Sequence, residues 1–175
     1  FSLAAKMLRQ NEYLAQYVLI KDSTKEMVVK SRGTLYKALA AESSNALGLS
    51  PVVVFADELG AVRGPTCQLA EAMETAVAAH AEPMTIYLST RASSPNDFFE
   101  IMVAEALTGA DPMVKCRIYS ADTSLDPFSV EAIKQANPGY DEGIMNKAEV
   151  KRMADEARRM PSRTPQYLNL ILNQV

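Results

Sequence analysis

Residues 51–60 read Pro51-Val-Val-Val-Phe-Ala-Asp-Glu-Leu-Gly60, a run of apolar residues that ends in two adjacent carboxylates. A continuous β-branched and aromatic run of this length is typical of a strand buried on both faces, as in a parallel sheet. Two neighbouring acids repel each other, so a purely structural purpose for them is not obvious. The stretch therefore predicts a buried strand followed by a polar site at its carboxyl end.

The rest of the chain alternates strands and helices and then changes to helices only. Besides residues 52–56, strands are predicted at 34–40, 84–88 and 114–119. Helices are predicted at 1–20, 65–81, 97–107, 129–135, 146–160 and 163–174, with a loop at Ser43–Asn45 and Gly48. The alternating order indicates βαβ units and a parallel sheet. We expect an α/β fold with a mostly parallel sheet flanked by helices over residues 1–125, and a helical C-terminal tail over residues 126–175.

Composition excludes several classes of protein. The 175 residues are 48% hydrophobic and 22% charged, which is ordinary for a globular protein. A net charge of −3 gives no overall attraction to nucleic acid. No run reaches about 18 apolar residues, so no membrane span is predicted. The sequence does not have the spacing of cysteines and histidines that a zinc site requires, since it contains only Cys67, Cys116 and His80. We expect reduced cysteines in a cytosolic setting.

Polar side chains follow two consecutive predicted strands. Asp57 and Glu58 end one strand, and Ser89 and Thr90 end the next. In an open parallel sheet, ligands bind beyond the carboxyl ends of the strands. Asp57 suits a Mg²⁺ ion, Glu58 suits a general base that polarises water, and Ser89 or Thr90 suits a hydrogen bond to that water or to a γ-phosphate. The same pattern also fits acids that cap a loop or face solvent, and the residues alone do not decide between the two.

The phosphate-binding loop that such a nucleotide site requires is absent from the sequence. That loop reads G-x-x-x-x-G-K-[ST], and its backbone N–H groups and lysine hold the phosphates. None of the seven glycines stands in this spacing.

Several segments resemble one family when they are taken in order. They are VVVFADE at 52–58, TIYLSTRAS at 85–93, YKALAAESSNALGLSPVVVFADE at 36–58, VEAIKQANPGYDEG at 130–143 and QYLNLILNQV at 166–175. The chain resembles the ATPase domain of tailed-phage terminase large subunits, the motors that package DNA. Three positions depart from the family pattern: Arg91 is inserted in the coupling motif, Ile133 stands where Trp is frequent, and Val175 ends the last match.

The resemblance implies a P-loop NTPase-like sheet that is incomplete at its N-terminal side. Asp57 would hold Mg²⁺, Glu58 would be the catalytic carboxylate of the Walker B strand, and Ser89 and Thr90 would contact the nucleotide. The phosphate loop would lie upstream of Phe1 and a nuclease domain downstream of Val175, so the fragment alone would be inactive.

The resemblance also implies the cofactors and partners of the intact protein. These are ATP and Mg²⁺, double-stranded DNA, a terminase small subunit, a portal or procapsid, and a homo-oligomeric ring in the bacterial cytoplasm. A trans-acting arginine is expected, but Arg32, Lys37 and Arg63 give no secure candidate.

Two alternatives stay open. One is a metal-dependent nuclease or phosphatase that uses Asp57 and Glu58 with Asp97 or Asp111. The other is a non-catalytic interaction domain with an ATPase-like shape. A basic concentration at residues 147–163 is interspersed with acids, which favours a solvated helix with i,i+4 ion pairs over a DNA contact.

Overall fold

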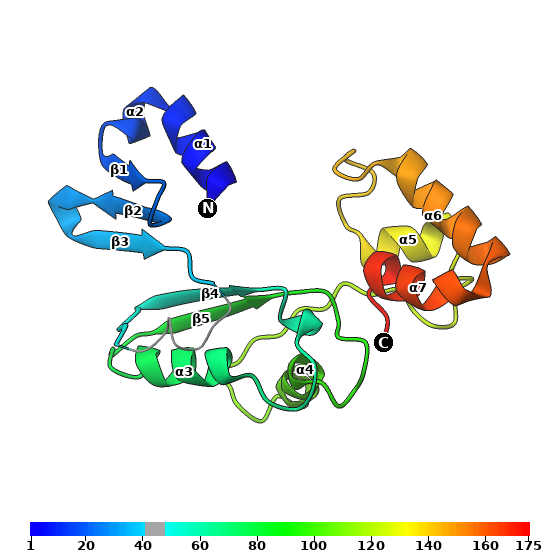
Figure 1. Ribbon diagram of the computed structural model, residues 1–175. Coiled ribbons are helices and arrows are strands. Elements are labelled where there is room, and N and C mark those ends of the chain that lie inside the picture. Colours follow the sequence, from blue (N-terminus) through cyan, green and yellow to red (C-terminus); the bar gives the residue numbers. More distant parts are fainter. Residues whose placement is uncertain (41–47) are drawn as a thin grey trace.

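The computed structural model describes residues 1–40 and 48–175, and the predicted loop at Ser43–Asn45 lies outside these residues. Figure 1 shows three units along the chain: an N-terminal unit, a central α/β layer and a C-terminal group of helices. The central layer lies between the two outer units and carries the candidate site.

The N-terminal unit is a pair of short helices followed by an antiparallel sheet. Helices α1 (Ser2–Gln10) and α2 (Glu12–Ala15) precede strands β1 (Val18–Lys21), β2 (Glu26–Val29) and β3 (Thr34–Lys37), which pair in the order β1-β2-β3. The prediction of one helix over residues 1–20 was therefore wrong, whereas the strand predicted from residue 34 is confirmed as β3.

Asn11 explains why the first helix stops. Its backbone is extended, and its side-chain oxygen accepts a hydrogen bond from the Leu14 N–H, which caps α2. A side chain that binds nearby backbone in this way competes with helix continuation. Downstream, residues 18–21 pair with β2, and these cross-strand pairs stabilise a strand. The helical spacing of apolar residues does not reveal this stabilisation.

The central layer contains two parallel strands with helices on one side. Strand β4 (Val53–Asp57) pairs with β5 (Met84–Leu88) in a register that places Asp57 opposite Leu88. Helices α3 (Gln68–Val77) and α4 (Phe98–Thr108) lie below the sheet in Figure 1. A cluster of buried side chains fills the helix-covered side: Leu59, Cys67, Ala70, Phe99 and Val103.

The prediction of a strand at residues 114–119 was wrong. These residues are not in a strand, and the described part of the chain pairs no strand with them. A strand needs hydrogen-bonded neighbours as well as a β-forming composition. Without such a neighbour the segment runs as an irregular connection to the C-terminal helices.

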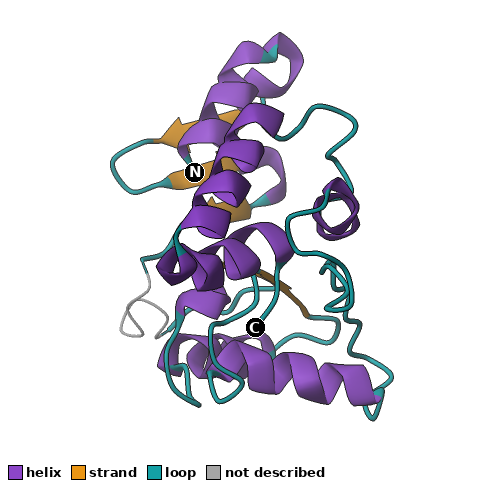
Figure 2. Cartoon of the chain, turned by 90° about the vertical axis from the view of Figure 1, so that its right-hand side faces the viewer, coloured by secondary structure: helices purple, strands orange, loops and turns teal. Residues whose placement is uncertain are grey.

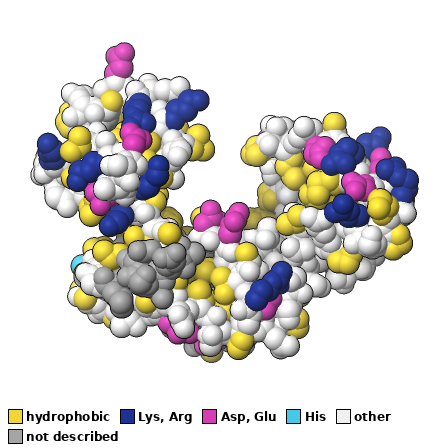
Figure 3. Space-filling view, in the orientation of Figure 1, with side chains coloured by type: hydrophobic (Ala, Val, Ile, Leu, Met, Phe, Trp, Pro, Cys, Tyr) yellow, Lys and Arg dark blue, Asp and Glu magenta, His cyan; other side chains and the backbone are white. Residues whose placement is uncertain are grey.

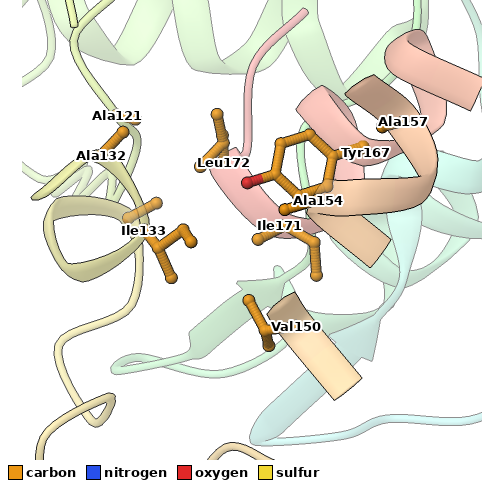
Figure 4. Close-up of a cluster of buried hydrophobic side chains, with 10 residues drawn as sticks. Ala121, Ala132, Ile133, Val150, Ala154, Ala157, Tyr167, Ile171 and Leu172 are labelled. Atoms are coloured by element: carbon orange, nitrogen blue, oxygen red, sulfur yellow. The ribbon is translucent and has the colours of Figure 1, made fainter. Parts of the chain in front are cut away.

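The C-terminal unit consists of helices only, as the sequence predicts. Helices α5 (Val130–Ala136), α6 (Lys147–Arg159) and α7 (Thr164–Leu172) enclose their own apolar cluster. Figure 4 shows Tyr167, Ile171 and Leu172 of α7 near Ile133 of α5 and Val150 of α6. Figure 2 views this helical unit from its outer side. The predicted fold class, parallel strands flanked by helices with a helical C-terminal part, is confirmed.

Among the described residues, no helix is both long and apolar enough to cross a membrane.

Candidate functional site at the ends of the parallel strands

The parallel register brings the two predicted polar strand ends to one edge of the sheet. Asp57 is the last residue of β4 and lies opposite Leu88, the last residue of β5. The ladder continues one residue further, because the Glu58 N–H donates to the Leu88 carbonyl at 2.8 Å. Both acids are exposed. Asp57 and Glu58 therefore lie next to Ser89 and Thr90, as the sequence predicts.

Glu58 has an unusual backbone conformation. Its φ of 59° and ψ of 31° lie in the left-handed region, and a 3₁₀ turn over Leu59–Ala61 follows at once. For a residue with a side chain, this conformation costs about 1–3 kcal/mol, and such residues cluster at functional sites. The strand therefore ends in a sharp turn that sets the direction of the Glu58 side chain.

Gly60 joins this turn to the segment after β5. Its N–H donates to the Ser89 hydroxyl oxygen at 2.8 Å. A Cβ built on Gly60 would lie 2.8 Å from that same oxygen and would overlap the Thr90 carbonyl oxygen. Only glycine fits here, because the two backbone segments touch each other. The glycine after the acid pair was not recognised from the sequence, although a Glu-Leu-Gly run after a strand is a turn signal.

Ser89 and Thr90 have different surroundings. The Ser89 oxygen accepts from Gly60, but its hydroxyl hydrogen is not used by that bond and can still be donated. Thr90 is exposed. The two hydroxyls thus remain able to donate beside the carboxylates.

Arg91, the residue inserted in the coupling motif, is held in an ion pair. Its guanidinium pairs with the Glu100 carboxylate, which is 3% exposed, and the Ala92 N–H donates to the same carboxylate at 2.9 Å. Hydrogen bonding to Glu100 raises the pKa of Arg91. The sequence signal for this pair is Glu100 itself, a lone acid inside the apolar stretch that begins α4.

The Asp97 carboxylate is bound by the loop that precedes α3. It accepts from the Gly64 N–H at 2.9 Å and from Arg63 at 3.1 Å. The Gly64 bond and then the Arg63 guanidinium hold the pKa of Asp97 below its ordinary value. Asp111 binds the Met113 N–H within its own turn. Over residues 1–40 and 48–175, no group of three or more His, Cys, Asp or Glu side chains could hold a metal ion. The nuclease alternative therefore gains no support from these two residues.

Several basic residues of the C-terminal helices are paired with acids. Arg152 contacts Glu149 and Glu156, and Arg163 also contacts Glu156. Arg158 lies 3.7 Å from Asp126. These pairs agree with the solvated, ion-paired helix that the sequence predicts.

The fold and the site together define an α/β protein in which parallel strands end in an acid pair beside hydroxyl side chains. No family profile matches the chain. The chain is 36% identical over 174 residues to the terminase large subunit of Enterobacteria phage HK97, and the match covers 99% of this chain and 34% of that protein.

A solved structure gives the same result. The crystal structure of the HK97 bacteriophage large terminase matches with a TM-score of 0.93 at 36% identity, over 99% of this chain and 36% of the terminase chain. The predicted resemblance to terminase large subunits is confirmed. The chain spans about a third of the length of these relatives.

Proposed function

We propose that this chain is part of the ATP-hydrolysing motor of a terminase large subunit, which moves double-stranded DNA into a procapsid. The single observation that carries the proposal is the in-register ending of β4 and β5. It places a carboxylate pair, one member of which has a left-handed backbone, beside two hydroxyls. Similarity to a phage terminase large subunit supports the same assignment.

Each residue of the site has a proposed role. Asp57 would hold Mg²⁺, because carboxylate oxygens are ligands that this hard cation prefers. Glu58 would orient the attacking water and accept its proton. Ser89 and Thr90 would donate hydrogen bonds to the water or to the terminal phosphate. A bound Mg²⁺ ion would neutralise part of the negative charge of the phosphates.

The proposed site is only half of what ATP hydrolysis needs. The sequence has no phosphate-binding loop, and the relatives are about three times longer than this chain. We propose that the loop is supplied by the remaining part of the protein. Residues 1–125 would then form part of the ATPase core, and residues 126–175 its helical subdomain. DNA, a small subunit, a portal and a ring of identical subunits are partners proposed for the intact protein.

Replacement of Glu58 tests this function. In the complete gene product, Glu58→Gln is expected to lower kcat for ATP hydrolysis about 10²–10⁴-fold, because an amide cannot accept the proton of water. ATP binding should persist. Phosphate release and nucleotide binding measure the two effects. Glu82→Gln is the matched control, since Glu82 is exposed in the turn before β5.

Two results would contradict the proposal. An unchanged kcat in Glu58→Gln would remove Glu58 from the reaction. A complete gene product without ATP binding would favour the non-catalytic interaction domain. Separately, the 175-residue chain alone is expected to show no Mg²⁺-dependent turnover, and turnover that Glu58→Gln abolishes would show that this chain already holds a whole site.

A further inference from the structure

We propose that Asn173 is a positioning residue that, together with Asn169, ties the post-β5 segment (residues 89–92) to the C-terminal helical unit. The post-β5 segment carries Ser89 and Thr90 at the candidate site. The inference rests on the proposed function and adds to it a route by which the helical unit controls the geometry of the site.

Both backbone polar groups of Arg91 are bound by side chains at the end of α7. The Arg91 N–H donates to Asn173 Oδ1 at 2.7 Å, across 82 positions of sequence. The Arg91 carbonyl accepts from Asn169 Nδ2 at 2.9 Å. Asn173 Nδ2 also donates to the Tyr119 carbonyl at 3.0 Å. One asparagine thus holds two chain segments that are not neighbours in sequence.

The position of Asn173 is itself fixed by the helical unit. Asn173 ends α7 with a left-handed backbone, φ 53° and ψ 40°, and its N–H bonds the Leu168 carbonyl. The preceding Leu172 is fully buried, and the Tyr167 hydroxyl donates to the Pro127 carbonyl. A movement of this packed unit therefore carries the Asn173 side chain with it.

The post-β5 segment is short and is held at both ends. Glu100 on α4 binds the Arg91 guanidinium and the Ala92 N–H, while Ser89 contacts Gly60 in the turn after the acid pair. Figure 1 shows the helical unit beside the central layer rather than on its sheet. Displacement of α7 relative to α4 would therefore act on Arg91 and, two residues away, on Ser89.

Two substitutions at Asn173 separate the hydrogen bonds from the backbone conformation. Asn173→Gly keeps the left-handed conformation and removes both side-chain bonds. Asn173→Asp keeps an acceptor for the Arg91 N–H and replaces the donor to Tyr119 by a second carboxylate oxygen. The matched control is Asn137→Ala, because the Asn137 amide donates to the Ile133 and Ile171 carbonyls inside the helical unit alone.

The experiment uses the complete gene product and two measurements. Asn173→Gly is expected to speed amide hydrogen exchange in the peptide that covers residues 89–95. It should also lower kcat for ATP hydrolysis about 10- to 100-fold with little change in KM, because small displacements of positioning groups slow the chemical step. Asn173→Asp should restore most of kcat, and Asn137→Ala should change neither measurement.

Three results would overturn the inference. The first is amide exchange in residues 89–95 that Asn173→Gly leaves unchanged. The second is faster exchange in Asn173→Gly without a change in kcat. The third is a loss of kcat in Asn137→Ala equal to that in Asn173→Gly. Failure of the proposed function looks different: the wild-type protein would not hydrolyse ATP, or Glu58→Gln would stay active. The exchange measurement would then still decide whether Asn173 holds the post-β5 segment.

Discussion

At the scale of single residues, the site depends on two backbone positions after β4. Glu58 adopts a left-handed conformation, and Gly60 makes room for the chain that follows β5. The turn is stabilised by the bond from Glu58 N–H to the Leu88 carbonyl and by the bond from Gly60 N–H to Ser89. The direction of the carboxylates is therefore set by backbone contacts with the neighbouring strand end.

Gly60→Ala is expected to destabilise the chain. The added methyl would overlap the Thr90 carbonyl oxygen, a backbone atom that cannot rotate away, and overpacking of this kind costs about 1–3 kcal/mol. Urea unfolding of the 175-residue chain measures the loss.

Gly139→Ala is the matched control for this test. Its Cβ would lie 2.7 Å from the end of the Ile144 side chain, which can move, so a smaller loss is expected. Equal losses in the two variants would show that the segments around Gly60 separate easily.

At the scale of elements, the start of α4 is fixed by a loop that is distant in sequence. The sequence leaves the cap of this helix open between Asn96 and Asp97, and Asp97 occupies the N-cap position. Its carboxylate, however, makes no capping bond to the helix and instead binds Gly64 and Arg63. The Phe98 N–H also donates to the Gly64 carbonyl at 2.7 Å. The loop before α3 and the start of α4 therefore stabilise each other.

The pH dependence of stability follows from the lowered pKa of Asp97. Because the folded pKa lies below the unfolded value of about 3.9, the Asp97 carboxylate stabilises the fold at higher pH, and this stabilisation is lost as pH falls through the folded pKa. Asp97→Asn removes the contribution. The difference in urea midpoint between wild type and variant should be largest near neutral pH and should shrink as pH falls below the unfolded pKa of about 3.9 and through the lower folded pKa.

Asp111→Asn serves as the control for this prediction, because the Asp111 side chain is exposed and bonds only within its own turn. It should change the midpoint at neutral pH less than Asp97→Asn does. A difference for Asp97→Asn that stays constant with pH would contradict the role given to its charge.

At the scale of the whole molecule, one face of the parallel sheet is uncovered. Phe55 is 64% exposed and Leu88 56% exposed, and Val53 and Met84 are exposed beside them. Figure 3 shows hydrophobic and acidic side chains on the surface of the central layer between the two outer units. An apolar strand face of this kind is typical of a contact surface.

Self-association of the 175-residue chain is expected from this surface. Light scattering should detect species larger than the monomer at micromolar concentration, and Phe55→Lys should reduce them. Val130→Lys, on an exposed position of α5, is the control and should have little effect. A monodisperse monomer for the unmodified chain would contradict the prediction.

Elements whose signals are local could be predicted from the residues alone. The strands at residues 53–57 and 84–88 and the helices after Ser129 and Asn146 form as predicted. The prediction that the strand before Asp57 is buried on both faces was wrong, because helices cover only one face of the described sheet and Phe55 is exposed on the other. The meeting of Asp57 and Glu58 with Ser89 and Thr90 follows from the same signals, because parallel strands end at a common edge.

Features that depend on partners distant in sequence became visible only in the folded chain. Residues 18–21 form a strand because β2 pairs with them, whereas residues 114–119 do not because no neighbour among the described residues pairs with them. Arg91 faces Glu100, and Asn173 reaches Arg91 across 82 positions. Hydrogen-bond partners and buried charges of this kind are set by packing between elements, which no local pattern of residues encodes.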